Sequence, residues 1–132
     1  MSGEPILLSI VEEGGYPDFA DEYRAAGFRV VSERTMRKAL STLKKLSPAV
    51  VVAEFNFQSD FRDRTSSLES LLATLQSRHP ESRVIILYDK ENERPFEDRL
   101  RSRWAIEAAL AFPVKPEDMR ACLQGLHRDA AP

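Results

Sequence analysis

The sequence has few of the residues that build covalent or membrane-bound frameworks. Its 132 residues include one cysteine, Cys122, which rules out an internal disulfide and a cysteine-rich zinc site. The longest apolar run, residues 6–11, is interrupted by Ser9 and is too short to span a bilayer. The start of the chain lacks the basic residues that open a secretory signal. We therefore expect a cytoplasmic protein without a membrane partner.

Neither sign of charge dominates. There are 19 Lys and Arg residues and 21 Asp and Glu residues, giving a net charge of -2. This balance provides no overall attraction to nucleic acid. Gly-x-Gly-x-x-Gly and the P-loop lysine motif are both missing, so dinucleotide and nucleoside triphosphate binding have no support. The length fits one domain, residues 1–132, with a core over about residues 5–128.

What the sequence does contain is an alternation of short apolar runs and amphipathic stretches. The runs are continuously apolar, as in strands that are buried on both faces of a sheet. They predict five strands, over residues 6–11, 28–31, 49–53, 84–87 and 109–112. The stretches between them predict helices over about residues 17–26, 36–46, 66–75, 96–108 and 116–126. Ser66 and Glu69 form a predicted capping box for the third helix.

This alternation predicts right-handed crossovers and a parallel sheet. Five strands in a chain of this length fit the flavodoxin-like order 2-1-3-4-5, a three-layer (βα)5 sandwich. Ligands of such sheets bind beyond the carboxyl ends of the strands. The residues expected there are acids, a tyrosine and a lysine: Glu12, Glu13, Glu54, Tyr88 and Lys115.

Residues 112–116, Phe-Pro-Val-Lys-Pro, end the fifth strand and open the last helix. With the spacing from Glu54 to Lys115, this segment resembles the response-regulator receiver family, of which chemotaxis regulators are members. The resemblance implies that two acids after the first strand bind magnesium and that an aspartate ending the third strand accepts a phosphoryl group. It also implies that a Thr or Ser after the fourth strand and a lysine after the fifth contact that group.

The resemblance implies these roles for particular residues. Lys115 matches the lysine, Phe112 matches the aromatic switch position, and Glu12 and Glu13 lie near the acidic pair. The sequence departs from the pattern where the chemistry is most demanding. Glu54 replaces the phosphoacceptor aspartate, and Tyr88 replaces the small hydroxyl residue.

Glutamate is one methylene longer than aspartate, and phosphoryl transfer depends on in-line positioning of the acceptor. We therefore expect Glu54 not to accept phosphate and to pair with Lys115 instead. Two readings of Glu54 stay open: it imitates the phosphorylated state, or it is a remnant with a structural role. Phosphorylation at another acid, Asp60 or Asp63, is a further alternative.

No cofactor is expected. If a metal binds, the candidate ligands are Glu12, Glu13, Glu54 and the carbonyl of Asn56, because oxygen ligands suit Mg²⁺. The alternative is a solvated acidic turn before Gly14.

Arginines crowd the predicted fourth helix beside the single tryptophan. The resemblance implies a dimer or partner face made by the fourth helix, fifth strand and fifth helix, which would hold Arg99, Arg103, Trp104 and Arg120. Arg and Trp are enriched in binding hot spots. The alternative is a solvated face.

We therefore expect a stand-alone, atypical receiver-like domain without an output domain. It would act in signalling by binding other proteins, with no need for phosphorylation and no enzymatic activity. The alternative is a small-ligand-binding or enzymatic flavodoxin-like domain, since one fold hosts many functions. That alternative requires a roomy pocket at Glu12, Glu54, Tyr88 and Lys115.

Overall fold

The computed structural model describes residues 5–11, 19–55 and 62–130. Five parallel strands form one sheet in the order β2-β1-β3-β4-β5, which confirms the predicted flavodoxin-like fold. The strands are β1 (Ile6–Ile10), β2 (Arg29–Glu33), β3 (Val50–Phe55), β4 (Arg83–Asp89) and β5 (Ala108–Phe112). The helices are α1 (Ala20–Ala25), α2 (Met36–Leu43), α3 (Arg62–Arg78), α4 (Glu93–Phe96) and α5 (Pro116–Ala130).

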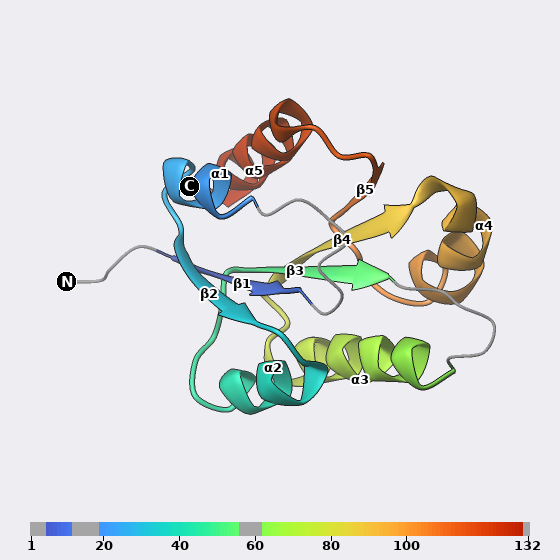
Figure 1. Cartoon of the computed structure of the whole chain (residues 1–132). Helices are drawn as coiled ribbons and strands as arrows, with labels where there is room; N and C mark the ends of the chain where they lie inside the picture. Colours follow the sequence, from blue (N-terminus) through green and yellow to red (C-terminus); the bar gives the residue numbers. More distant parts are fainter. Residues whose placement is uncertain (1–4, 12–18, 56–61, 131–132) are drawn as a thin grey trace.

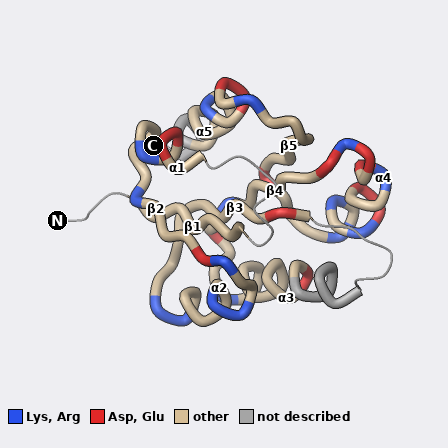
Figure 2. The backbone as a smooth tube through the Cα atoms, in the orientation of Figure 1, with Lys and Arg blue, Asp and Glu red and all other residues tan. Residues whose placement is uncertain are grey.

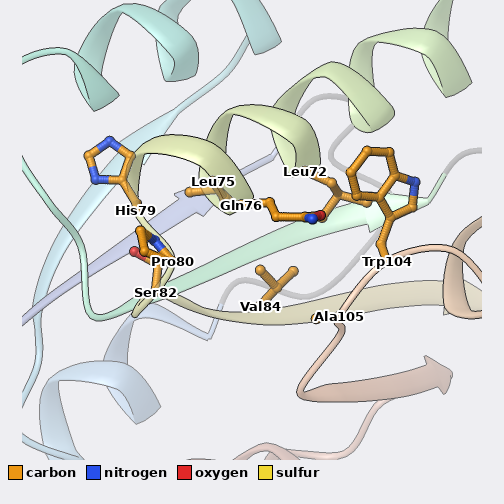
Figure 3. A pocket seen from close by; sticks show the side chains of 9 residues that line it. All are labelled: Leu72, Leu75, Gln76, His79, Pro80, Ser82, Val84, Trp104 and Ala105. Carbon is orange, nitrogen blue, oxygen red and sulfur yellow. The ribbon is translucent and has the colours of Figure 1, made fainter.

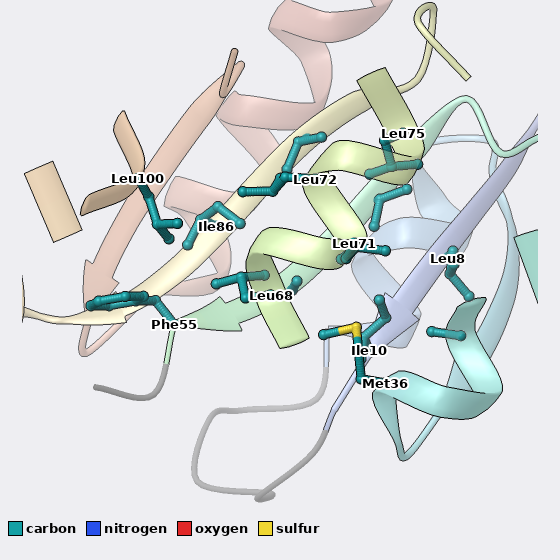
Figure 4. Close-up of a cluster of buried hydrophobic side chains, with 14 of the residues drawn as sticks. Leu8, Ile10, Met36, Phe55, Leu68, Leu71, Leu72, Leu75, Ile86 and Leu100 are labelled. Atoms are coloured by element: carbon teal, nitrogen blue, oxygen red, sulfur yellow. The ribbon is translucent and has the colours of Figure 1, made fainter. Parts of the chain in front are cut away.

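Helices cover both faces of the sheet, with α1 and α5 on one side and α2 and α3 on the other (Figure 1). Alternate side chains along each strand point to opposite faces and pack into two separate cores. Leu7, Val52 and Leu87 pack with α1 and α5. Leu8, Val51 and Ile86 pack with α2, α3 and the α4 region (Figure 4). This double burial explains why the strands read as unbroken apolar runs.

Local signals explain where the first two helices end and begin. The chain turns after α1 at Gly27, whose φ of 95° suits a residue without Cβ. Thr35 caps α2, because its hydroxyl oxygen accepts a hydrogen bond from the backbone N–H of Lys38 at 3.1 Å. The start of α5 at Pro116 confirms the predicted helix opening.

The predicted capping box of α3 is wrong. The helix begins at Arg62, so Ser66 lies inside it and cannot be its N-cap. The predicted start was set by the apolar stripe that contains Leu68 and Leu75, and a helix can extend beyond such a stripe.

The predicted fourth helix is shifted. Helical structure runs from a 3₁₀ turn, η1 (Lys90–Asn92), through α4 to a wider π-helical turn, η2 (Glu97–Arg101). The Asp89 side chain accepts a hydrogen bond from the Glu91 N–H at 3.0 Å and starts the segment early. At the other end, the Ser102 N–H donates to the Glu97 carbonyl at 3.0 Å, a bond across five residues that closes the last turn.

Candidate functional site

The carboxyl edge of the sheet brings together residues that lie far apart in sequence. The register pairs Glu54 of β3 with Leu87 of β4, and Leu87 with Leu110 of β5. One step further along, Phe55 is paired with Tyr88. Glu54 and Tyr88 therefore lie on neighbouring strands, one residue out of register, at the edge where ligands of parallel sheets bind.

Glu54 is a buried acid on the central strand. Its side chain is 4% exposed, and it is the one charged residue among the buried positions of the described chain. By the alternation of β3, it leaves the strand on the same side as Val50 and Val52, toward α1 and α5. A carboxylate removed from water is maintained only where the surrounding structure compensates its charge. A soluble phosphate donor would also have to reach an acid that solvent hardly touches.

Lys115 lies three residues beyond β5, and its side chain is exposed. The ion pairs of the described residues join other partners, and none links Lys115 to Glu54. The predicted pairing of these two residues is therefore not found. A long, exposed lysine gains little from one fixed partner in water, because holding it still costs side-chain entropy.

Glu54 is paired with Leu87, and Tyr88 is the next residue of β4. Successive side chains of a strand point to opposite faces, so Tyr88 points away from the face that Glu54 occupies. Its ring is 7% exposed and stacks on Phe96 of α4, with centroids 4.6 Å apart and an interplanar angle of 11°. Phe96 also meets Phe55 at 5.7 Å in a tilted arrangement. Three aromatic side chains thus join the ends of β3 and β4 to α4.

The Tyr88 hydroxyl donates a hydrogen bond of 3.3 Å to Oε1 of Glu93. Burial raises the pKa of the phenol above its usual range, and the nearby Glu93 carboxylate raises it further. The phenol therefore stays protonated and able to donate across the ordinary pH range. This bond is a second link from β4 to α4, in addition to the stacked rings.

Phe112, at the predicted aromatic switch position, ends β5 opposite Asp89 of β4. It is 38% exposed and is the one large apolar side chain exposed in the described part of the chain. Four predicted site residues, Glu12, Glu13, Asn56 and Asp60, lie outside the described residues. Asp63 falls in the first turn of α3. In residues 5–11, 19–55 and 62–130 there is no cluster of three potential metal ligands.

The predicted partner face is not one surface in the structure, because Trp104 and Arg120 lie on different sides of the sheet. Trp104 lies beside Leu72 of α3 and lines a groove there of about 100 Å³, on the side of the sheet away from α5 (Figure 3). Arg120 lies on α5 and is 4.0 Å from Glu117. Trp104 packs against the core between α3 and β4, on the opposite side of the sheet from α5, so it does not share a surface with Arg120.

The sequence did not predict the contact of Tyr88 with Phe96. The four-residue step from Phe96 to Leu100 is a signal that both are buried on one helical face. Nothing local indicates that this face meets the end of β4, because that depends on how the segment after Asp89 turns. The described residues also contain no helix of the length and apolar character that a membrane crossing requires.

Comparisons with solved structures agree with this geometry. The receiver domain of the Francisella response regulator 1452 superimposes with a TM-score of 0.71 at 16% identity, covering 96% of this chain and 99% of the other. The fold is that of the response-regulator receivers. The chemotaxis response regulator CheY4 of Vibrio cholerae gives a TM-score of 0.67 at 16% identity, covering 93% and 98%.

The inactive form of the regulatory domain of RitR, the repressor of iron transport regulator, gives a TM-score of 0.71 at 21% identity, covering 96% and 97%. No family model matches the sequence. A search of curated proteins also finds no match. At these identities the receiver likeness establishes the fold, and the chemistry has to be argued from this chain's own residues.

Proposed function

We propose that this chain is a receiver-like signalling domain that binds other proteins without being phosphorylated at position 54. The observation that carries the proposal is the buried Glu54 at the end of β3, 4% exposed. In the receiver pattern that the sequence resembles, this is the position of the phosphoacceptor aspartate. The longer glutamate displaces the carboxylate from in-line attack, on which phosphoryl transfer depends.

The second support is Tyr88, at the position of the small hydroxyl residue. Its ring is stacked on Phe96 and its hydroxyl is bonded to Glu93. A side chain fixed by two contacts is poorly suited to move in response to a phosphoryl group. We infer that the segment from Asp89 to Arg101 has one preferred position, which partners can recognise without a signal at Glu54.

The fold adds a general expectation. The neighbours that share it are receiver domains, including chemotaxis and iron-transport regulators. Receivers pass on signals by protein contacts, so the partners proposed here are other signalling proteins. A cytoplasmic setting suits the single cysteine, Cys122.

Partner binding before and after treatment with a phosphate donor tests the proposal. The full chain serves as bait, and a captured partner is purified and titrated against untreated chain and against chain incubated with acetyl phosphate and Mg²⁺. We expect the same Kd in both titrations. A Kd that changes after treatment, and changes back on dephosphorylation, would contradict the proposal.

Glu54→Gln separates the two roles of the glutamate. The amide keeps the shape of the side chain and removes its charge. Weaker partner binding by this variant would mean that the carboxylate imitates the phosphorylated state. Unchanged binding would mean that Glu54 has a structural role only.

A further inference from the structure

The surface between α2 and α3 contains an open groove of about 480 Å³. The two helices lie side by side below the sheet (Figure 1). Apolar groups from both helices line the groove, namely Leu40 and Leu43 from α2 and Ala73 from α3. Leu43 is buried, whereas Leu40 is partly exposed and Ala73 is exposed, so the groove offers apolar surface to a partner.

Cations flank this apolar surface. Lys44 follows α2, and Arg78 ends α3, and both line the groove with exposed side chains. Arg37 lies three residues before Leu40 and seven before Lys44, a spacing that places all three on one helical face. The bond from His79 to the Leu43 carbonyl, 2.9 Å long, ties the ends of the two helices together and sets this arrangement.

The charge around α2 has one sign. Residues 34–53 contain no acid and five basic residues, which are Arg34, Arg37, Lys38, Lys44 and Lys45. Figure 2 shows them at both ends of α2. None of the five, nor Arg78, forms an ion pair within the described parts of the chain. By contrast, arginines such as Arg83 and Arg101 do pair with carboxylates. In a chain with a net charge of -2, this is a marked local concentration of positive charge.

We propose that the α2–α3 groove, formed by Leu40, Leu43, Lys44, Ala73 and Arg78, docks an acidic amphipathic segment of a partner protein. Apolar side chains of the segment would rest on Leu40 and Ala73, and its carboxylates would meet Lys44, Arg78 and Arg37. An amphipathic helix laid in an apolar groove is a common mode of peptide recognition. Charges at the rim steer encounter and set the choice of partner.

The lining favours protein over the other polyanions. Single-stranded nucleic acid binds through aromatic side chains on which its bases stack, and no aromatic residue lines this groove. A membrane-binding helix presents a projecting apolar face, whereas Leu40 and Leu43 lie in a concave surface. Thr74 and Ser77 add hydroxyl groups on α3 that suit a peptide's polar side chains.

This proposal rests on the interaction function proposed above, adds a second surface to the segment from Asp89 to Arg101, and names a class of partner for that surface; it makes no use of Glu54. The test is selection of a phage-displayed library of random dodecapeptides on the full chain, followed by titration of the enriched peptides. We expect acidic peptides with apolar residues at helical spacing. The Lys44→Glu, Arg78→Glu double variant should weaken their binding by about tenfold or more.

Arg24→Glu, Arg29→Glu is the matched control, because both arginines are exposed and lie outside the groove and outside the segment from Asp89 to Arg101. It should bind these peptides as the unaltered chain does. Leu40→Ser tests the apolar contact and should also weaken binding. Thermal unfolding of each variant confirms that it is folded before the titrations are compared.

Several results would overturn the proposal: no enrichment, enrichment of neutral or basic peptides, or equal loss in the control variant. Duplex DNA and vesicles of phosphatidylserine with phosphatidylcholine are titrated alongside. Binding to either of them that exceeds peptide binding and is abolished by Lys44→Glu, Arg78→Glu would also overturn it. Loss of peptide binding in Glu54→Gln alone would place the site at the sheet edge instead. A negative result in the peptide experiment would not change the outcome of the phosphate-donor experiment, so each proposal can be contradicted without the other.

Discussion

Two neighbouring strands, β3 and β4, end in the centre of this sheet, and the side chains of their penultimate residues differ in direction and in chemistry. Glu54 leaves β3 toward α1 and α5 and is a buried acid. Tyr88 leaves β4 toward α3 and α4 and is held by an aromatic stack and a hydroxyl bond. In the receiver pattern that the sequence resembles, one of these positions accepts the phosphoryl group and the other contacts it. Here each belongs to a different core, so we expect them to act separately.

Relative to the receiver pattern that the sequence resembles, each of the two positions keeps one property and changes another. At Glu54, charge is retained and the position of the charge is altered. At Tyr88, the hydroxyl is retained and is bonded to Glu93. Neither change requires the sheet to move, because both side chains continue strands whose register is set by the apolar residues before them.

Removing the ring on which Tyr88 stacks should have the largest effect. Phe96 is fully buried against Tyr88 and Phe55. Phe96→Ala should lower the free energy of unfolding by about 3–5 kcal/mol, through lost burial and the cavity left behind. Urea unfolding followed by circular dichroism measures this. Phe112→Ala, at the exposed end of β5, is the control and should cost under about 1 kcal/mol. Equal losses would mean that the aromatic stack is not a main support of the α4 region.

Restoring a small hydroxyl side chain at Tyr88 should have the next largest effect. Tyr88→Thr removes the ring and should cost roughly 2–4 kcal/mol. It should also raise amide hydrogen exchange in residues 90–101, since both links to α4 are lost. Exchange that rises equally in α1 and α5 would instead indicate a general loss of stability, and the separation of the two faces would then be wrong.

The Tyr88 hydroxyl alone should contribute less. Its bond to Glu93 is long, at 3.3 Å, so Tyr88→Phe should cost about 0.5–1.5 kcal/mol. The phenol pKa is raised above 10.0 in the folded state, so the unfolded chain loses this proton first. Stability from this group is therefore complete below pH 10 and falls as pH rises above it. The free energy of unfolding of Tyr88→Phe should therefore decrease less above pH 10 than that of the unaltered chain. Urea unfolding at a series of pH values would show this.

The smallest expected value is the coupling between the two positions. Glu54→Gln and Tyr88→Phe should add in the double variant to within about 0.5 kcal/mol, as independent sites do. A double-mutant cycle of unfolding free energies measures the coupling. A coupling above about 1 kcal/mol would show that the two faces communicate through the sheet.

The sequence was sufficient to predict the sheet and its order, because strands buried on both faces leave unbroken apolar runs such as Val50–Ala53. It was insufficient for the α4 region. There the helix starts at a side-chain cap from Asp89 and ends in a wide turn, neither of which changes the apolar pattern. The partner-face prediction for Trp104 rests on the resemblance and on the enrichment of Arg and Trp in binding hot spots, whereas its place beside Leu72 depends on tertiary packing.

The site residues show the same division. The carboxyl ends of parallel strands lie at one edge of the sheet, so the sequence was sufficient to predict that Glu54 and Tyr88 lie there. Whether two of them touch depends on side-chain placement beyond the strands, which the apolar pattern does not specify. The expected contact of Glu54 with Lys115 is absent among the described ion pairs.

The central claim is that the receiver fold is kept here without phosphate chemistry at Glu54. The most direct measurement is the intact mass of the full chain after incubation with acetyl phosphate and Mg²⁺, with a competent receiver treated in parallel. We expect the competent receiver to gain one phosphoryl group and this chain to keep its mass. A phosphoryl adduct on this chain that Glu54→Gln abolishes would contradict the claim, and an adduct that persists in Glu54→Gln would place the phosphate on another acid.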